Sequence, residues 1–166
     1  MINLKPYQQK KAGFCGPVCL KMVMDFYKVV IPEAEINKAS GATFDRKLSG
    51  AKMAKAARKF GFDVFSKENA TMVDLERFIK DGKPVIVRWF LDDVEPDGHY
   101  SVVVDVGKKE VVLADPIIKK ILIYTRRRKM SVRNFMKVWF DYKGEYLNKP
   151  SDMIIRWMMV MTPKKK

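Results

Sequence analysis

The chain has 166 residues, of which 48% are hydrophobic and 31% charged, so its composition is that of a folded globular protein and excludes a disordered one. Its length suits a single domain over residues 1–166, and its net charge of +14 favours anionic partners through long-range attraction. The sequence has neither a secretory signal at its N-terminus nor an apolar run of about 18 residues that could cross a bilayer, so we expect a soluble, cytoplasmic protein.

Apolar residues at helical spacing predict four helices in the first half of the chain. The first covers residues 15–28 and has Pro17 in its first turn, where the missing N–H costs nothing. The other three are expected over residues 33–41, over residues 50–60 between Ser49 as N-cap and Gly61 as C-cap, and from Thr71, in a capping box with Asp74, to residues 81–82.

The second half of the chain is rich in β-branched residues and predicts a sheet. Ser131 caps one further helix over residues 132–140. Helices followed by successive strands predict an α+β fold, with the N-terminal helices packed on a C-terminal antiparallel sheet. The strands are expected at residues 85–90, 101–106, 110–114, 121–125 and 153–161, with a hairpin turn at residues 107–109.

Two cysteines, Cys15 and Cys19, lie one turn apart in the first predicted helix, and we expect both to be reduced. Cys15 stands at the helix N-terminus, where unpaired N–H groups and the helix dipole favour a thiolate, the reactive form of a thiol. Cys19 lies on the apolar face with Met22 and Phe26, which is typical of a core thiol. With a single histidine in the chain, these thiols do not supply the ligands of a zinc site.

Three side chains could form a thiol-based acyl-transfer site. Cys15 would be the nucleophile, and His99, the only histidine, the only candidate base. Asp115 ends the strand that follows the hairpin, so it should lie near His99 and could accept a hydrogen bond from the imidazole. The amide of Gln9, or of the adjacent Gln8, could stabilise an oxyanion next to Cys15.

The motifs around these residues resemble the bacteriocin-processing peptidases, a family of papain-like cysteine peptidases that remove double-glycine leader peptides. Gln9 and the run from Cys15 to Leu20 form the first motif, Gly98-His99-Tyr100 the second, and Ala114-Asp115-Pro116 the third. The resemblance extends over residues 6–139 and includes Phe135 and Trp139. It departs from the family at Phe14, where an acidic residue usually precedes the cysteine.

The resemblance implies a papain-like fold and a role for each of four residues. Cys15 would be the nucleophile, and His99 the general base and then the general acid. Asp115 would orient His99, and the family spacing selects Gln9 over Gln8 for the oxyanion hole. Family members usually form the N-terminal domain of an ABC exporter, whereas no membrane span or ATPase segment follows here, so we expect a stand-alone peptidase domain.

We therefore predict a cysteine peptidase that hydrolyses a peptide or protein through a thioester and needs no cofactor or metal. A Gly-Gly leader peptide is the substrate that the family implies, and the sequence does not determine the oligomeric state. Two alternatives stay open: an acyl or peptidyl transferase using the same thiol, and a non-catalytic basic binding module. The basic clusters at residues 126–129 and 164–166 and the acidic run at 92–97 are expected to be solvated, and no specific nucleic-acid binding is predicted.

Overall fold

The computed structural model describes residues 1–44, 48–91, 97–117, 127–144 and 146–165. Its first three helices match the predicted ones closely. Ser49 caps the third through its side chain, which accepts a hydrogen bond from the Lys52 N–H, and the left-handed Gly61 follows the C-cap Phe60. These helices are α1 (Cys15–Phe26), α2 (Glu33–Ser40) and α3 (Gly50–Lys59).

The fourth predicted helix is α4 (Met72–Lys80), and its capping box between Thr71 and Asp74 is confirmed. The Thr71 side chain accepts the Asp74 N–H, and the Asp74 carboxylate accepts the Thr71 N–H in return. The predicted helix after Ser131 is α5 (Val132–Val138). It ends before the predicted residue 140 because Trp139 leaves helical geometry and Phe140 begins a strand.

An antiparallel sheet of six strands forms the centre of the molecule, in the order β1-β8-β2-β3-β4-β5. The predicted α+β class is therefore confirmed. The hairpin turn between the third and fourth strands lies at the predicted place, where the Gly107 N–H donates to the Glu110 carbonyl. The six strands are β1 (Phe62–Lys67), β2 (Val85–Leu91), β3 (Asp97–Val106), β4 (Glu110–Ala114), β5 (Arg127–Ser131) and β8 (Met158–Pro163).

Three of the described strands, β1, β5 and β6 (Phe140–Tyr142), were not predicted, and one predicted strand cannot be compared. Of these, β1 lies at the sheet edge and pairs with β8 alone, and its apolar residues Phe62, Val64 and Phe65 do not keep a strict alternation. Such a strand lacks the apolar alternation that identifies a half-buried one. The strand predicted at residues 121–125 lies outside the described residues, as does most of the acidic run at 92–97.

The single strand predicted over residues 153–161 is wrong. The chain forms two strands there, β7 (Met153–Ile155) and β8, separated at Arg156, whose φ of 47° is left-handed. β7 pairs with β6 (Phe140–Tyr142) in a separate two-stranded sheet, preceded by the short 3₁₀ helix η2 (Pro150–Asp152), whereas β8 enters the main sheet. Apolar residues flank Arg156 on both sides, so the hydrophobic pattern did not reveal the break.

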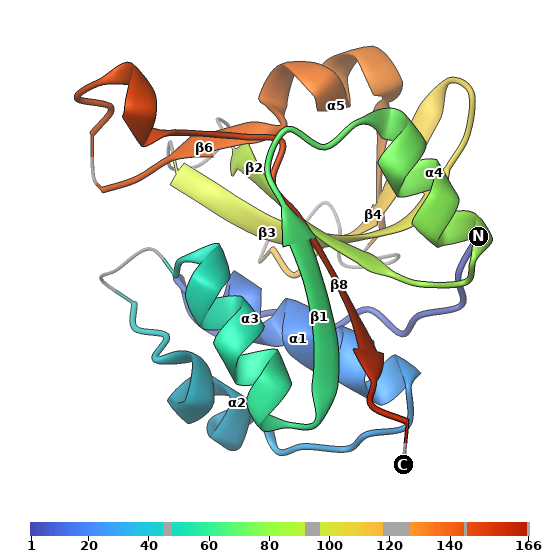
Figure 1. The fold of residues 1–166 in the computed structure, drawn as a ribbon, viewed down its shortest axis with the longest axis vertical. Helices are drawn as coiled ribbons and strands as arrows, with labels where there is room; N and C mark the ends of the chain where they lie inside the picture. The colour runs from blue at the N-terminus through green and yellow to red at the C-terminus, as the bar shows by residue number, and fades with distance from the viewer. Residues whose placement is uncertain (45–47, 92–96, 118–126, 145, 166) are drawn as a thin grey trace.

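Helices cover both faces of the main sheet (Figure 1). One apolar cluster joins α1, α2 and α3 to the sheet and includes Cys19 and Tyr100. A second cluster joins the other face to α4 and α5 through Leu75 and Phe135. β2 is buried along nearly its whole length because it has neighbours on both faces and both edges. This arrangement places the start of α1 against β3, where the candidate site lies.

Candidate active site

Cys15 is the first residue of α1 and is buried. The turn before it requires Gly13, which has a φ of 78° and approaches the Thr43 carbonyl so closely that a Cβ would lie 2.5 Å from that oxygen. Gly16 allows the first turn to approach Leu48 and Met53. The N–H groups of a first helical turn lack intrahelical acceptors, so the Cys15 thiol lies where negative charge is stabilised.

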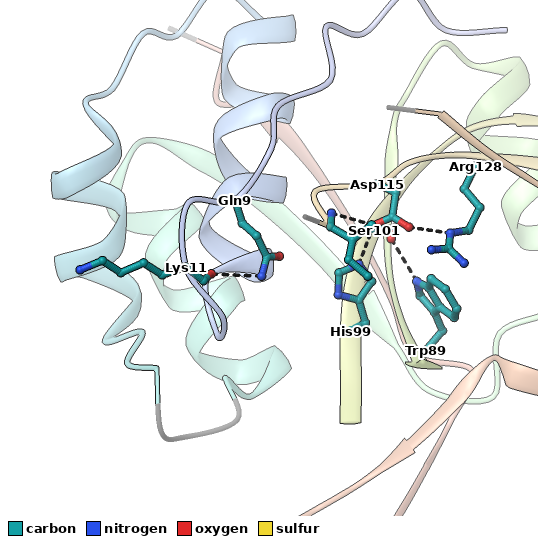
Figure 2. A network of polar contacts seen from close by, with 8 residues as sticks. Gln9, Lys11, Trp89, His99, Ser101, Asp115 and Arg128 are labelled. Carbon is teal, nitrogen blue, oxygen red and sulfur yellow. Dashed lines mark hydrogen bonds and ion pairs between the residues drawn. The ribbon is translucent and has the colours of Figure 1, made fainter. Parts of the chain in front are cut away.

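His99 and Asp115 form a buried pair (Figure 2). Nε2 of His99 lies 2.6 Å from Oδ1 of Asp115. The strand predicted at residues 101–106 begins earlier, at Asp97, so His99 lies within β3. Asp115 directly follows β4, whose last residue, Ala114, is paired with Val102 of β3. The predicted proximity of these two side chains across the hairpin is therefore confirmed.

The pKa of His99 depends on opposing effects. Burial lowers it, whereas the charge of Asp115, the hydrogen bond to Asp115 and a hydrogen bond to Cys15 raise it, with a net result of about 10. Nε2 is engaged by Asp115, which leaves Nδ1 as the ring nitrogen for the thiol. An imidazole with this pKa is protonated at neutral pH and can stabilise negative charge on the sulfur of Cys15.

Gln9 lies in the segment that precedes α1 and is buried, with 9% of its surface exposed. Its backbone N–H donates to the carbonyl of Pro116 at 2.8 Å, which ties it to the residue after Asp115. Its side-chain Nε2 donates to the Lys11 carbonyl at 3.1 Å. An amide nitrogen carries two protons, so one of them is left for another acceptor.

Cys19 is fully buried in the cluster between α1 and the sheet, as predicted. Burial raises the pKa of its thiol well above the ordinary value, and the charges of Cys15 and Asp115 raise it further. Cys19 is therefore a protonated core thiol. Both cysteines are free.

Two arginines of the predicted basic cluster point into the protein, so the expectation of a solvated face is wrong for them. Arg127 donates from Nη2 to the Leu4 carbonyl at 2.9 Å. Arg128 donates from Nε to Oδ2 of Asp115 at 2.7 Å, and its side chain is only 16% exposed. A run of basic residues does not reveal such contacts, because they depend on which strand β5 joins. Arg126 lies outside the described residues.

Arg88 and Asp141 form a second buried ion pair that the sequence did not indicate. Arg88 lies in β2 beside Tyr100, and its guanidinium is 5.6 Å from the centre of that ring. Asp141, in β6, touches the backbone of Gly98, the residue before His99. A glycine is required at position 98 because a Cβ there would overlap the Asp141 carboxylate.

We predict that Gly98→Ala lowers the free energy of unfolding by about 3 kcal/mol or more, since the methyl group would displace a buried carboxylate from its arginine. Gly107→Ala is the matched control: it follows the other end of β3, and its Cβ would lie 3.6 Å from the nearest atom, the Glu110 carbonyl oxygen. Its expected change is below about 1 kcal/mol. Urea unfolding of both variants measures the difference, and equal stabilities would contradict the packing described.

A hollow of about 650 Å³ opens beside Gln9, between the segment before α1, α1 itself and α2. Its walls combine an aromatic and an aliphatic side chain with charges of both signs, so it can contact both the backbone and the side chains of a peptide. The lining residues are Tyr7, Gln8, Gln9, Lys10, Val18, Lys21 and Glu33.

Within the described part of the chain, no group of three or more His, Cys, Asp or Glu side chains could hold a metal ion. None of the helices described there is long and apolar enough to cross a membrane.

Solved peptidase domains share this fold over nearly the whole chain. The peptidase domain of Streptococcus ComA, a bifunctional ABC transporter of a quorum-sensing pathway, has a TM-score of 0.72 and 20% identity, covering 98% of this chain and 100% of that one. A double-glycine-motif protease from an AMS/PCAT transporter, solved with its leader peptide, has a TM-score of 0.70 and 19% identity, covering 98% and 93%. A C39-like peptidase from Bacillus anthracis has a TM-score of 0.73 and 13% identity, covering 99% and 96%.

The architecture is thus that of the papain-like cysteine peptidases, hydrolases that cleave peptide bonds through a thiol. The sequence model of the peptidase C39 family matches residues 3–143. The chain therefore belongs to this family and is a cysteine peptidase. No curated protein matches the sequence.

Proposed function

We propose that Cys15, His99, Asp115 and Gln9 form the catalytic site of this peptidase, and that it cleaves a peptide after a Gly-Gly pair. The observation that carries the proposal is the buried His99–Asp115 pair, whose Nε2 and Oδ1 atoms lie 2.6 Å apart, with Cys15 close enough to contribute to the raised pKa of His99. A thiol, a proton-transferring imidazole and an orienting carboxylate are the parts that nucleophilic acyl transfer requires.

The proposed reaction has two stages. The Cys15 sulfur attacks the scissile carbonyl carbon, and the Cys15 N–H together with the Gln9 amide stabilises the oxyanion that forms. Imidazolium His99 protonates the leaving amine as the C–N bond breaks, which leaves a thioester on Cys15. Neutral His99 then removes a proton from water, whose oxygen attacks the thioester; the C–S bond breaks, the carboxylic acid product leaves and loses its proton to solvent, and the Cys15 thiolate is restored beside imidazolium His99.

The substrate class is inferred from the relatives and from the surface. One structural neighbour is a double-glycine-motif protease solved with its leader peptide. The hollow beside Gln9 has the size and mixed lining that suit part of a peptide. The net charge of +14 would attract an acidic peptide over a long range.

Peptide cleavage followed by mass spectrometry tests the proposal. The wild-type protein is expected to cut a leader-like peptide after Gly-Gly and to leave a matched peptide with Val-Val intact. Cys15→Ala should abolish cleavage, whereas Cys19→Ala, which removes only a buried core thiol, should retain it in the folded protein. Cleavage that survives Cys15→Ala and disappears in folded Cys19→Ala would contradict the proposed nucleophile.

The same assay separates hydrolysis from the transferase alternative. With an added amine such as glycinamide, a hydrolase still releases mainly the free carboxylic acid, whereas a transferase releases mainly the amide. Membership of a peptidase family favours the enzymatic interpretation over the non-catalytic basic module.

A further inference from the structure

Arg128 and His99 bind opposite oxygens of the Asp115 carboxylate (Figure 2). Nε2 of His99 lies 2.6 Å from Oδ1, and Nε of Arg128 lies 2.7 Å from Oδ2. The N–H of Ile117 also donates to Oδ1, at 3.1 Å. With a partner on each oxygen, the carboxylate cannot rotate about its Cβ–Cγ bond without losing a hydrogen bond. Its orientation toward His99 is therefore set partly by β5.

Trp89 closes a ring of contacts between Arg128 and His99. The guanidinium of Arg128 lies 5.3 Å from the centre of the Trp89 ring. The same ring meets the His99 imidazole edge to face, with centres 5.5 Å apart at an angle of 81°. The Trp89 Nε1–H donates to Oγ of Ser101 at 3.0 Å, which fixes the ring in place. Arg128 thus contacts His99 through two intermediates, Asp115 and Trp89.

We propose that Arg128 is a positioning residue of this peptidase, which holds Asp115 in the orientation that directs Oδ1 at His99. The inference rests on the catalytic roles proposed above for Asp115 and His99. Arginine suits this position because its planar group can donate from Nε to a carboxylate while stacking on an aromatic ring, which lysine cannot do.

Arg128 also affects how strongly Asp115 holds the proton on His99. Burial raises the pKa of Asp115, but the charge and hydrogen bond of His99, together with the charge of Arg128, lower it overall. Arg128 and His99 share the negative charge of one carboxylate, so loss of the arginine charge should raise the pKa of His99. The thioester would then be hydrolysed efficiently only at higher pH, because that step needs neutral imidazole.

Three variants test the role: Arg128→Gln, Arg128→Lys and, as a control, Lys129→Gln. Lys129 is exposed in the same strand, so its loss removes an equal charge without touching Asp115. Arg128→Gln should lower kcat about 10- to 100-fold with little change in KM, since Arg128 contacts no reacting atom. Its kcat–pH profile should shift to higher pH. Arg128→Lys should recover part of kcat, and Lys129→Gln should resemble the wild type.

A second readout does not require a substrate. His99 is the only histidine, so the imidazole region of the NMR spectrum reports one ring. The Nε2–H of His99 should be protected from exchange in the wild type and exchange faster in Arg128→Gln, because a carboxylate without its second partner leaves the hydrogen bond more often, although its charge still raises the pKa of His99 while the bond is formed.

Two results would overturn the role of Arg128: an unchanged kcat per folded molecule, or a His99 ring signal whose shift and exchange are the same in Arg128→Gln. Urea unfolding provides the count of folded molecules. If the wild type itself cleaves no peptide, the proposed function fails, while the NMR comparison still decides whether Arg128 positions Asp115 and His99.

Discussion

Replacing His99 with alanine is expected to lower kcat/KM for peptide cleavage by about 10⁴-fold at pH 7. Two contributions disappear together. The imidazolium no longer stabilises charge on the Cys15 sulfur, and no group remains to protonate the leaving amine or to activate water. His99 is the only histidine in the chain, so no second imidazole can replace it.

Alkylation of Cys15 by iodoacetamide separates the first contribution from the second. At pH 6, His99→Ala should react more slowly than the wild type by about 10-fold or more, because it lacks the imidazolium that stabilises negative charge on the sulfur. His99→Gln, which keeps a polar side chain but cannot carry a proton, should behave like the alanine variant. Equal alkylation rates in all three proteins would contradict an interaction between His99 and the thiol.

Replacing Asp115 with asparagine is expected to have the second largest effect, a fall in kcat of about 10³- to 10⁴-fold with the fold retained. An amide cannot stabilise the imidazolium, and it can present a donor where His99 needs an acceptor. Peptide hydrolysis measures this loss. A variant with wild-type kcat would show that Asp115 does not orient the base.

The same substitution should change how stability depends on pH. The pKa of His99 is raised from 6.5 to about 10 on folding, so its protonation stabilises the fold fully below pH 6.5, and this contribution is lost as the pH rises toward 10. The pKa of Asp115 is lowered on folding, so its contribution is present above its ordinary value of 3.8 and is lost in acid.

Asp115→Asn removes both dependences. Burial then dominates and lowers the pKa of His99, so the decline between pH 6.5 and 10 should disappear. Urea unfolding measures the free energy of unfolding of the wild type and the variant at several pH values. The difference between the two proteins at each pH is compared, because the titration of the surface lysines is the same in both and cancels. A difference in free energy that stays constant from pH 4 to 9.5 would contradict the His99–Asp115 pairing.

The helices and the order of the candidate site residues could be predicted from the sequence because their signals are local. Ser49 and the Thr71–Asp74 box cap helices through backbone groups within three residues, so their effect needs no tertiary contact. The position of Cys15 at a helix start follows from the same kind of signal. The proximity of His99 and Asp115 also followed from a short hairpin, which pairs residues close in sequence.

The split of residues 153–161 into two strands and the buried contacts around the site were decided by the tertiary structure. Both depend on strands that come together from distant parts of the chain. The left-handed Arg156 redirects one apolar segment into two sheets, and no pattern of hydrophobicity records a backbone angle. The burial of Asp141 against Gly98 likewise depends on which strands meet.

The sequence by itself determined the α+β class and the order of three candidate site residues along the chain: Cys15 at a helix start, then His99, then Asp115. Only the tertiary structure decided how tightly these groups are held, because β5 must lie beside β4 before Arg128 can reach Asp115. The electrostatic interaction between two groups depends on their distance in space, and the number of residues between them in the sequence does not give that distance.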